Sequence, residues 1–73
     1  MGKLEAKSDV SGSVWKIEVA LGQKVAEGDI LVLIESMKME IPVVVETAGT
    51  VASILVAEGD AIIEGQPIVI LET

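Results

Sequence analysis

The chain has 73 residues, no cysteine, no histidine and a formal net charge of −7. Its length predicts one small domain over residues 1–73, which buries only about 60% of its unfolded surface. Without thiol or imidazole groups, metal binding by those ligands and general base catalysis by histidine are excluded. Five lysines in so acidic a chain do not form the positive cluster that nucleic-acid binding needs. No apolar run approaches the ~20 residues of a membrane span, so neither nucleic acid nor membrane is an expected partner.

Aliphatic residues supply the expected core, because Trp15 is the only aromatic residue. The abundant β-branched residues favour strands over helices. Trp15 is interpreted as a core residue or as a plug on the surface of the barrel, and its counterpart Ala52 indicates that the fold does not require it. A cysteine-free chain suits a reducing compartment, and the first residues lack the apolar stretch of a signal peptide, so we expect a cytoplasmic protein.

The expected elements follow the same order in each half of the chain: short strand, small-residue turn, longer strand, glycine-bracketed unit and final strand. In the first half they are Lys3–Lys7, Ser11–Ser13, Val14–Val19, Gly22–Gly28 and Ile30–Glu35. In the second half they are Met39–Glu46, Ala48–Thr50, Val51–Val56, Gly59–Gly65 and Pro67–Glu72. Glycine in the turns is expected to supply backbone angles that other residues avoid.

The two halves are copies of one another. Residues 11–35 align without a gap on residues 48–72, at an offset of 37, with ten identities. Eight short strands with glycine turns predict two small sheets or a flattened barrel, and two gapless copies, about 1–36 and 37–73, predict quasi-twofold symmetry. The junction of the copies and the chain termini should therefore lie at opposite ends of the domain.

Some local patterns resist assignment. Trp15, Ile17 and Val19 alternate and are interpreted as sharing one face, whereas Val14 breaks that alternation and the segment 30–34 is apolar throughout. The tetrapeptide Ala-Glu-Gly-Asp occurs at 26–29 and 57–60, at an offset of 31, and is read as two turns at different places in the repeat. Pro42 predicts an edge strand or a bulge.

Lys38 lies at the junction of the copies, between Met37 and Met39. Almost nothing separates the strands on either side, so a tight hairpin is expected with Lys38 at or beside its tip. The turn lacks the usual Asn-Gly or Asp-Gly, and exposed methionines are typical of contact surfaces that fit more than one partner. The alternative is an ordinary turn lysine, with the methionines folded back over the core.

The segment 35–43, Glu-Ser-Met-Lys-Met-Glu-Ile-Pro-Val, resembles the attachment site of biotinyl/lipoyl carrier domains, most closely the biotin carboxyl carrier type. The resemblance covers essentially the whole chain. It implies an all-β flattened barrel of two four-stranded antiparallel sheets with Lys38 on an exposed hairpin. Ser36 stands where alanine is commoner in the family, and the gapless repeat leaves no room for the protruding thumb of some bacterial carriers.

The resemblance also implies a function. Lys38 is expected to carry biotin on its side-chain amine, attached by a biotin protein ligase, and to shuttle carboxyl groups between biotin carboxylase and carboxyltransferase components. Met37 and Met39 are assigned to recognition by these enzymes, with Ser36 and Glu35 as further recognition positions, although Glu35 has a counterpart in the other copy and a structural role is open. The chain itself is expected to be neither an enzyme nor a metal protein.

Two alternatives stay open. Lipoyl sites typically carry Asp-Lys-Ala, so Met37 and Met39 oppose a lipoyl carrier, but Glu35 is shared with lipoyl sites. Modification by both a biotin ligase and a lipoate ligase is therefore an alternative. A barrel that is never modified and acts as an interaction module is a further alternative, which substitution of Lys38 by arginine would separate from the carriers.

Overall fold

The computed structural model describes residues 2–73, and within them the chain forms eight strands and no helix. No segment of this range is therefore a helix that could cross a membrane. The strands are β1 (Lys3–Lys7), β2 (Gly12–Ile17), β3 (Lys24–Val25), β4 (Ile30–Ser36), β5 (Met39–Val44), β6 (Gly49–Ile54), β7 (Ala61–Ile62) and β8 (Pro67–Glu72). The all-β class predicted from the sequence is confirmed, and each glycine-bracketed unit contributes a two-residue strand, β3 or β7.

The strands form two four-stranded antiparallel sheets, ordered β1-β8-β6-β3 and β5-β4-β2-β7. Each sheet takes strands from both halves of the chain. Moving every strand by one copy converts the first order into the second, so the predicted quasi-twofold symmetry is present in the topology. β5 is an edge strand, as Pro42 predicts, because proline has no N–H to offer a further neighbour.

The backbone hydrogen bonds between the two halves of the chain repeat the symmetry. The Gly22 amide donates to the Val51 carbonyl, and its counterpart, the Gly59 amide, donates to the Val14 carbonyl, both at 2.8 Å. A second pair of hydrogen bonds is related by the repeat in the same way: the Gly28 amide donates to the Val45 carbonyl, and the Gly65 amide donates to the Ser8 carbonyl. The two halves are therefore interlocked, with each copy holding the glycine turns of the other.

The four glycine turns share one construction. In the turn that begins at Ala26, the Ala26 amide donates to Asp29 Oδ2 at 2.8 Å, and the intervening glycine has a φ of +93°. The turn from Ala57 to Asp60 is the same, with a distance of 2.9 Å and a glycine φ of +94°. The repeated Ala-Glu-Gly-Asp thus marks one turn type at two places in the repeat. Gln23 and Gln66 accept the equivalent bond in the other two turns.

Bulges explain why the apolar alternation could not be assigned. Val14 pairs with Ile34, but Lys16 pairs with Leu33, so Trp15 is an extra residue in β2. A bulge changes which face each later residue occupies. Val14 therefore points into the core, and the interpretation that Trp15 shares one face with Ile17 and Val19 is wrong. Of the two placements expected for Trp15, the structure shows the one on the barrel surface. Matching shifts occur between β4 and β5, between β1 and β8, and between β6 and β8.

The core lies between the two sheets and is aliphatic throughout. Its members come from both copies, as the repeat requires, and several are fully enclosed. The buried apolar residues are Val14, Val19, Val25, Leu31, Val32, Ile34, Val43, Val45, Val51, Ile62, Ile68, Val69 and Leu71. Corresponding residues, such as Val32 and Val69, both have no exposed surface.

Gly12 and Gly49 belong to strands rather than turns, and their φ angles are not positive, so the expected role in turn geometry is wrong for them. Their role is close approach of two backbones. A Cβ on Gly49 would lie 2.6 Å from the Glu72 carbonyl oxygen, and a Cβ on Gly12 would overlap the Glu35 carbonyl. Glycine is required because a side chain would displace β4 or β8.

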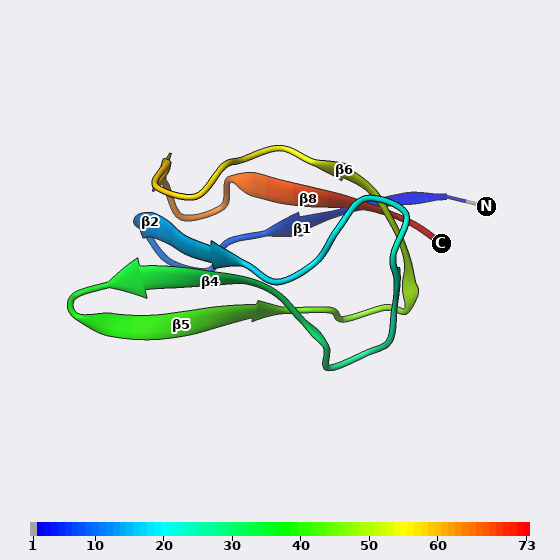
Figure 1. Ribbon diagram of the computed structural model, residues 1–73, viewed down its shortest axis with the longest axis horizontal. Helices are drawn as coiled ribbons and strands as arrows, with labels where there is room; N and C mark the ends of the chain where they lie inside the picture. Colours follow the sequence, from blue (N-terminus) through cyan, green and yellow to red (C-terminus); the bar gives the residue numbers. More distant parts are fainter. Residues whose placement is uncertain (1) are drawn as a thin grey trace.

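The molecule is elongated, with extents of 36 × 18 × 18 Å. Figure 1 shows the two termini together at one end and the β4–β5 hairpin at the other, as the repeat predicts. At the terminal end, the Gly2 amide donates a hydrogen bond to the Thr73 carbonyl at 3.1 Å, and the Thr73 amide donates one to the Gly2 carbonyl at 2.9 Å. This pair is the counterpart of Ser36 and Met39, which are paired at the base of the hairpin turn.

Candidate attachment site

The β4–β5 hairpin turns in two residues. Ser36 pairs with Met39, which leaves Met37 and Lys38 as the two central residues. Their φ angles are +51° and +66°. Positive φ at both central residues is the geometry of a type I′ turn, whose twist matches that of the flanking strands. The predicted tight hairpin with Lys38 at its tip is confirmed.

The residues in this turn are poorly suited to its geometry. Type I′ turns favour Asn-Gly because most side chains clash with the backbone at positive φ. Within residues 2–73, Met37 and Lys38 are the only non-glycine residues with positive φ. Each such residue costs about 1–2 kcal/mol relative to the right-handed region. This cost is consistent with a functional site, where unfavourable backbone angles are commonly found.

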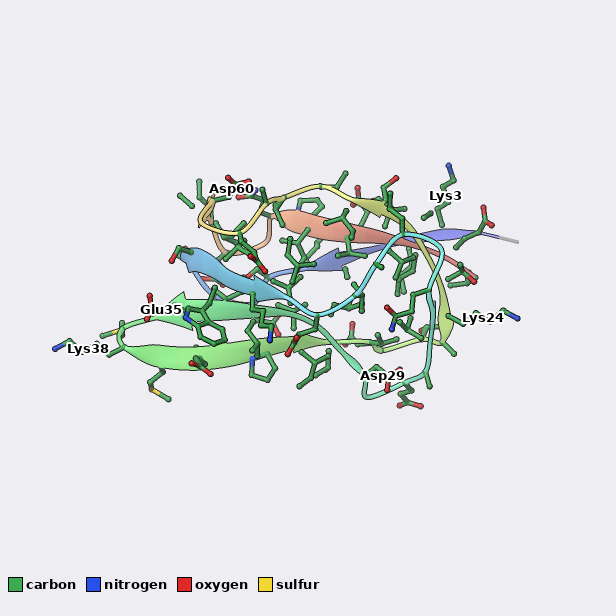
Figure 2. The ribbon with its side chains drawn as sticks, viewed as in Figure 1. Lys3, Lys24, Asp29, Glu35, Lys38 and Asp60 are labelled. Atoms are coloured by element: carbon green, nitrogen blue, oxygen red, sulfur yellow. The ribbon has the colours of Figure 1, made fainter. Side chains whose placement is uncertain are left out.

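The hairpin places its side chains in solvent. Met37 is 93% exposed and Met39 is 63% exposed, so the alternative in which they fold back over the core is wrong. Lys38 is exposed, and Figure 2 shows its side chain at the extreme end of the molecule, directed away from the barrel. Lys3 and Lys24 lie at the opposite end.

The Lys38 amine makes no ion pair with any carboxylate in the part of the chain that the structure describes. The two ion pairs among residues 2–73 join Lys7 to Glu5 at 4.0 Å and Lys16 to Glu18 at 3.8 Å. An amine with no carboxylate partner can enter another protein's active site without breaking a bond to its own chain. This geometry fits covalent attachment of a group to the amine.

All five residues predicted for the site lie on one hairpin, and all five are at least partly exposed. Glu35 and Ser36 end β4, Met37 and Lys38 form the turn, and Met39 begins β5. Residues 2–73 contain no cluster of three carboxylate, thiol or imidazole side chains that could hold a metal ion. The site is an accessible amine with contact residues around it.

Two features of the site were not found from the sequence. Glu40 pairs directly with Glu35 across the hairpin, and both side chains are exposed. Trp15, expected in the core or as a plug, lies on the outer face of the sheet that carries the hairpin and is 49% exposed. The Trp15/Ala52 mismatch in the repeat was the available signal, because a position that the fold leaves free can serve another purpose.

Comparison with known proteins agrees with this geometry. The biotin/lipoyl family model described as Biotin-requiring enzyme matches residues 3–71. This chain belongs to that family. It is a biotin carrier domain that holds biotin covalently, and it acts as a carrier rather than a catalyst.

Among its relatives, the Biotinylated protein TB7.3 homolog of Mycobacterium leprae is 40% identical over 67 residues, covering 92% of this chain and 94% of that protein. The Biotin/lipoyl attachment protein of Bacillus subtilis is 40% identical over 56 residues, covering 77% of each chain. Among solved structures, the carrier resembles part of the Kluyveromyces lactis urea carboxylase with a TM-score of 0.93 and 30% identity. That match covers 99% of this chain and 6% of the carboxylase.

Proposed function

We propose that Lys38 is the residue to which biotin is attached, and that the arm so formed carries carboxyl groups between the active sites of a carboxylase. The observation that supports this most directly is the position of Lys38. It is exposed, free of ion pairs within residues 2–73, and held at the end of a two-residue turn. Among the five lysines it alone combines these properties with flanking exposed methionines.

Attachment requires an activated acyl group and a deprotonated amine. Because the amine attacks through its lone pair, a biotin protein ligase must accept the proton that Lys38 Nζ gives up. The Nζ lone pair then attacks the carbonyl carbon of a biotinyl-adenylate. An amide bond forms, the acyl–phosphate bond breaks, and AMP leaves with the electron pair. The chain contributes the nucleophile and its presentation, and the ligase supplies the activation.

The attached group supplies the chemistry of carboxyl transfer, and the barrel supplies its placement. A long arm on a rigid hairpin keeps the reacting end at a high effective concentration near two active sites. We propose biotin carboxylase and carboxyltransferase components as the partners after attachment. Met37, Met39, Ser36 and Glu35 are proposed to contact the ligase and these components. The cysteine-free chain suits the cytoplasm, which we propose as its location.

A second candidate is attachment of lipoate to the same amine. It is favoured by Glu35, three residues before the lysine, and by the printed name of the Bacillus subtilis relative, Biotin/lipoyl attachment protein. Lipoate would form the same amide bond with Lys38 through its own adenylate. The two candidates differ in the ligase that accepts this hairpin.

Intact mass measurement separates these functions. The wild type, Lys38→Arg and the matched control Lys24→Arg are each expressed with a biotin ligase and separately with a lipoate ligase. One biotinyl increment on the wild type and the control, absent from Lys38→Arg, is expected. A lipoyl increment that is lost in the same variant would add the second candidate. An increment that persists in Lys38→Arg, or no increment from either ligase, would overturn the proposal.

A further inference from the structure

We propose that the outer face of the sheet that carries Lys38 is a docking surface for the ligase, with Trp15 as its anchor. The Trp15 face is defined here by Trp15, Leu33, Pro42, Glu35 and Glu40. This inference rests on the proposed attachment at Lys38. It extends recognition from the turn down the outer face of β4 and β5, and adds β2, which is not part of the hairpin.

Strand register places these residues in two rows below the tip. The row nearer Lys38 holds Glu35 opposite Glu40. The next row holds Leu33 opposite Pro42. On the other side of Leu33, the bulge in β2 turns two successive side chains outward, Trp15 and Lys16. The face therefore passes from the amine through a carboxylate row to an apolar row.

The other copy of the repeat shows what the fold alone requires. The counterpart of Trp15 is Ala52, which occupies the equivalent bulge in β6. Pro42 corresponds to Glu5, which pairs with Ile70 on the equivalent face. A small residue and a charged residue thus serve these two positions on the second sheet, so Trp15 and Pro42 are not needed to build the barrel. Leu33 keeps an apolar counterpart, Ile70.

The charges differ between the copies in the same way. Glu40 corresponds to Lys3, and Glu35 corresponds to Glu72. Lys3 pairs with Glu72, an attractive arrangement, whereas Glu40 pairs with Glu35, a repulsive one. Like charges directly opposite on a sheet are unfavourable. The hairpin copy keeps the unfavourable pair beside the attachment site.

These departures indicate the chemistry of the partner. Two adjacent carboxylates match a partner surface that presents lysine or arginine side chains. The chain's net charge of −7 also attracts such a surface at longer range. The nearby Lys16 does not cancel the carboxylates, because it pairs with Glu18 at 3.8 Å. A half-exposed indole is the residue type that most often anchors a protein interface. The partner is expected to offer an apolar pocket bordered by basic groups.

The ligase is the expected occupant because of what it must recognise. It binds the chain before biotin is attached, so it has only protein surface to distinguish this lysine from the other four. A carboxylase component can also bind the attached biotin. The Trp15 face is continuous with the hairpin. A ligase that encloses Lys38 from the outer face of this sheet therefore covers the hairpin and the Trp15 face together.

Biotinylation kinetics provide the first test, using the variants Trp15→Ala, Ala52→Trp and their double combination. For Trp15→Ala we expect KM for the carrier to rise about tenfold to thirtyfold with kcat unchanged. Ala52→Trp alone should behave as the wild type. The double variant moves the indole to the wrong sheet and should remain as poor as Trp15→Ala. Leu55→Ala, which removes another half-exposed apolar side chain, is the matched control and should leave KM unchanged.

Glu40→Lys tests the charge part of the inference separately. It replaces the repulsive pair by the arrangement found at Lys3 and Glu72. KM is expected to rise severalfold, and the dependence of kcat/KM on salt is expected to weaken. An unchanged KM for this variant would overturn the assignment of the carboxylate row to ligase binding.

NMR reports directly on the anchor, because the chain has one tryptophan. The indole N–H signal of ¹⁵N-labelled Lys38→Arg carrier should shift or broaden on addition of unlabelled ligase. A normal thermal transition for Trp15→Ala excludes misfolding as the cause of a raised KM. If wild type is biotinylated and Trp15→Ala has wild-type kinetics, the docking inference fails while the attachment site stands. A Trp15→Ala defect confined to carboxyl transfer would overturn the choice of the ligase. Absence of any biotinylation would refute the proposed function itself.

Discussion

The two halves of this chain agree in their interior and differ on one outer face. Val32 and Val69 are identical and equally buried, and the glycine turns of both halves make matching hydrogen bonds. On the outer face, Trp15 occupies the position that Ala52 occupies in the other copy. A duplicated fold thus provides its own reference, in which agreement identifies what the barrel needs and disagreement identifies positions available for recognition.

The two ends of the molecule give the same contrast. At the terminal end, Gly2 and Thr73 pair without unfavourable backbone angles among the described residues. At the hairpin end, the equivalent pair, Ser36 and Met39, is joined by two residues with positive φ. Among residues 2–73, the unfavourable backbone angles are therefore confined to the turn that holds Lys38.

The largest expected effect tests the agreement between the copies. Gly12→Ala should lower the free energy of unfolding by about 3 kcal/mol, because its Cβ would overlap the Glu35 carbonyl. Gly49→Ala should cost less, since its Cβ would lie 2.6 Å from the Glu72 carbonyl oxygen, farther than the Cβ on Gly12 would lie from the Glu35 carbonyl oxygen. Gly22→Ala, where the Cβ meets nothing within 4 Å but φ is +82°, should cost about 1 kcal/mol.

Urea unfolding of the three alanine variants measures this order. Equal losses at Gly12 and Gly49 would mean that the closer approach at Gly12 adds no cost. A loss at Gly22 larger than at Gly12 would contradict the close-approach explanation and favour backbone angle as the main requirement at all three positions.

The next effect concerns the two ends. Replacing Met37-Lys38 by Asn-Gly should raise the free energy of unfolding by about 2 kcal/mol, because these residues suit a type I′ turn. For a domain of this size that is a rise in Tm of roughly 8–16 °C. Calorimetry measures the shift. The control Lys38→Arg keeps the positive φ and should melt as the wild type, whereas an unchanged Tm for the Asn-Gly variant would refute the stated cost.

The smallest effect concerns the unequal charges. Glu40→Lys should stabilise the fold by about 0.5–1 kcal/mol at low salt, since it replaces a repulsive cross-strand pair by an attractive one. Thermal unfolding at two salt concentrations measures the gain, which should shrink as salt rises. Lys3→Glu is the reverse change on the other sheet and should destabilise by a similar amount. A stabilising Lys3→Glu would remove the contrast between the two faces.

Much of the fold could be predicted because duplication supplies long-range information that a single sequence usually lacks. The gapless offset predicted eight strands, the two poles and the position of Lys38 at one of them. The resemblance of the segment 35–43 to carrier sites then implied the sheet arrangement and the cofactor. These predictions rest on features that the repeat or a specific motif encodes along the chain.

The bulges could not be predicted, and they are the reason that Trp15 does not share a face with Ile17 and Val19. A bulge inserts one residue in a strand, and its place depends on the partner strand's register rather than on local pattern. The role of Gly12 was misjudged for a similar reason, since the carbonyl that it approaches is distant in sequence. The pairing of Glu35 with Glu40 also needed the register of the turn.

The most direct test of Lys38 as the functional end is to map biotin on the wild-type chain. Biotinylated protein is cleaved with a glutamate-specific protease, which releases the peptide of residues 36–40, and each lysine-containing peptide is quantified by mass spectrometry. We predict that the whole biotinyl increment lies on Lys38, with none on Lys3, Lys7, Lys16 or Lys24. Biotin on any of the other four lysines in comparable amount would contradict the claim that the hairpin presents a unique attachment site.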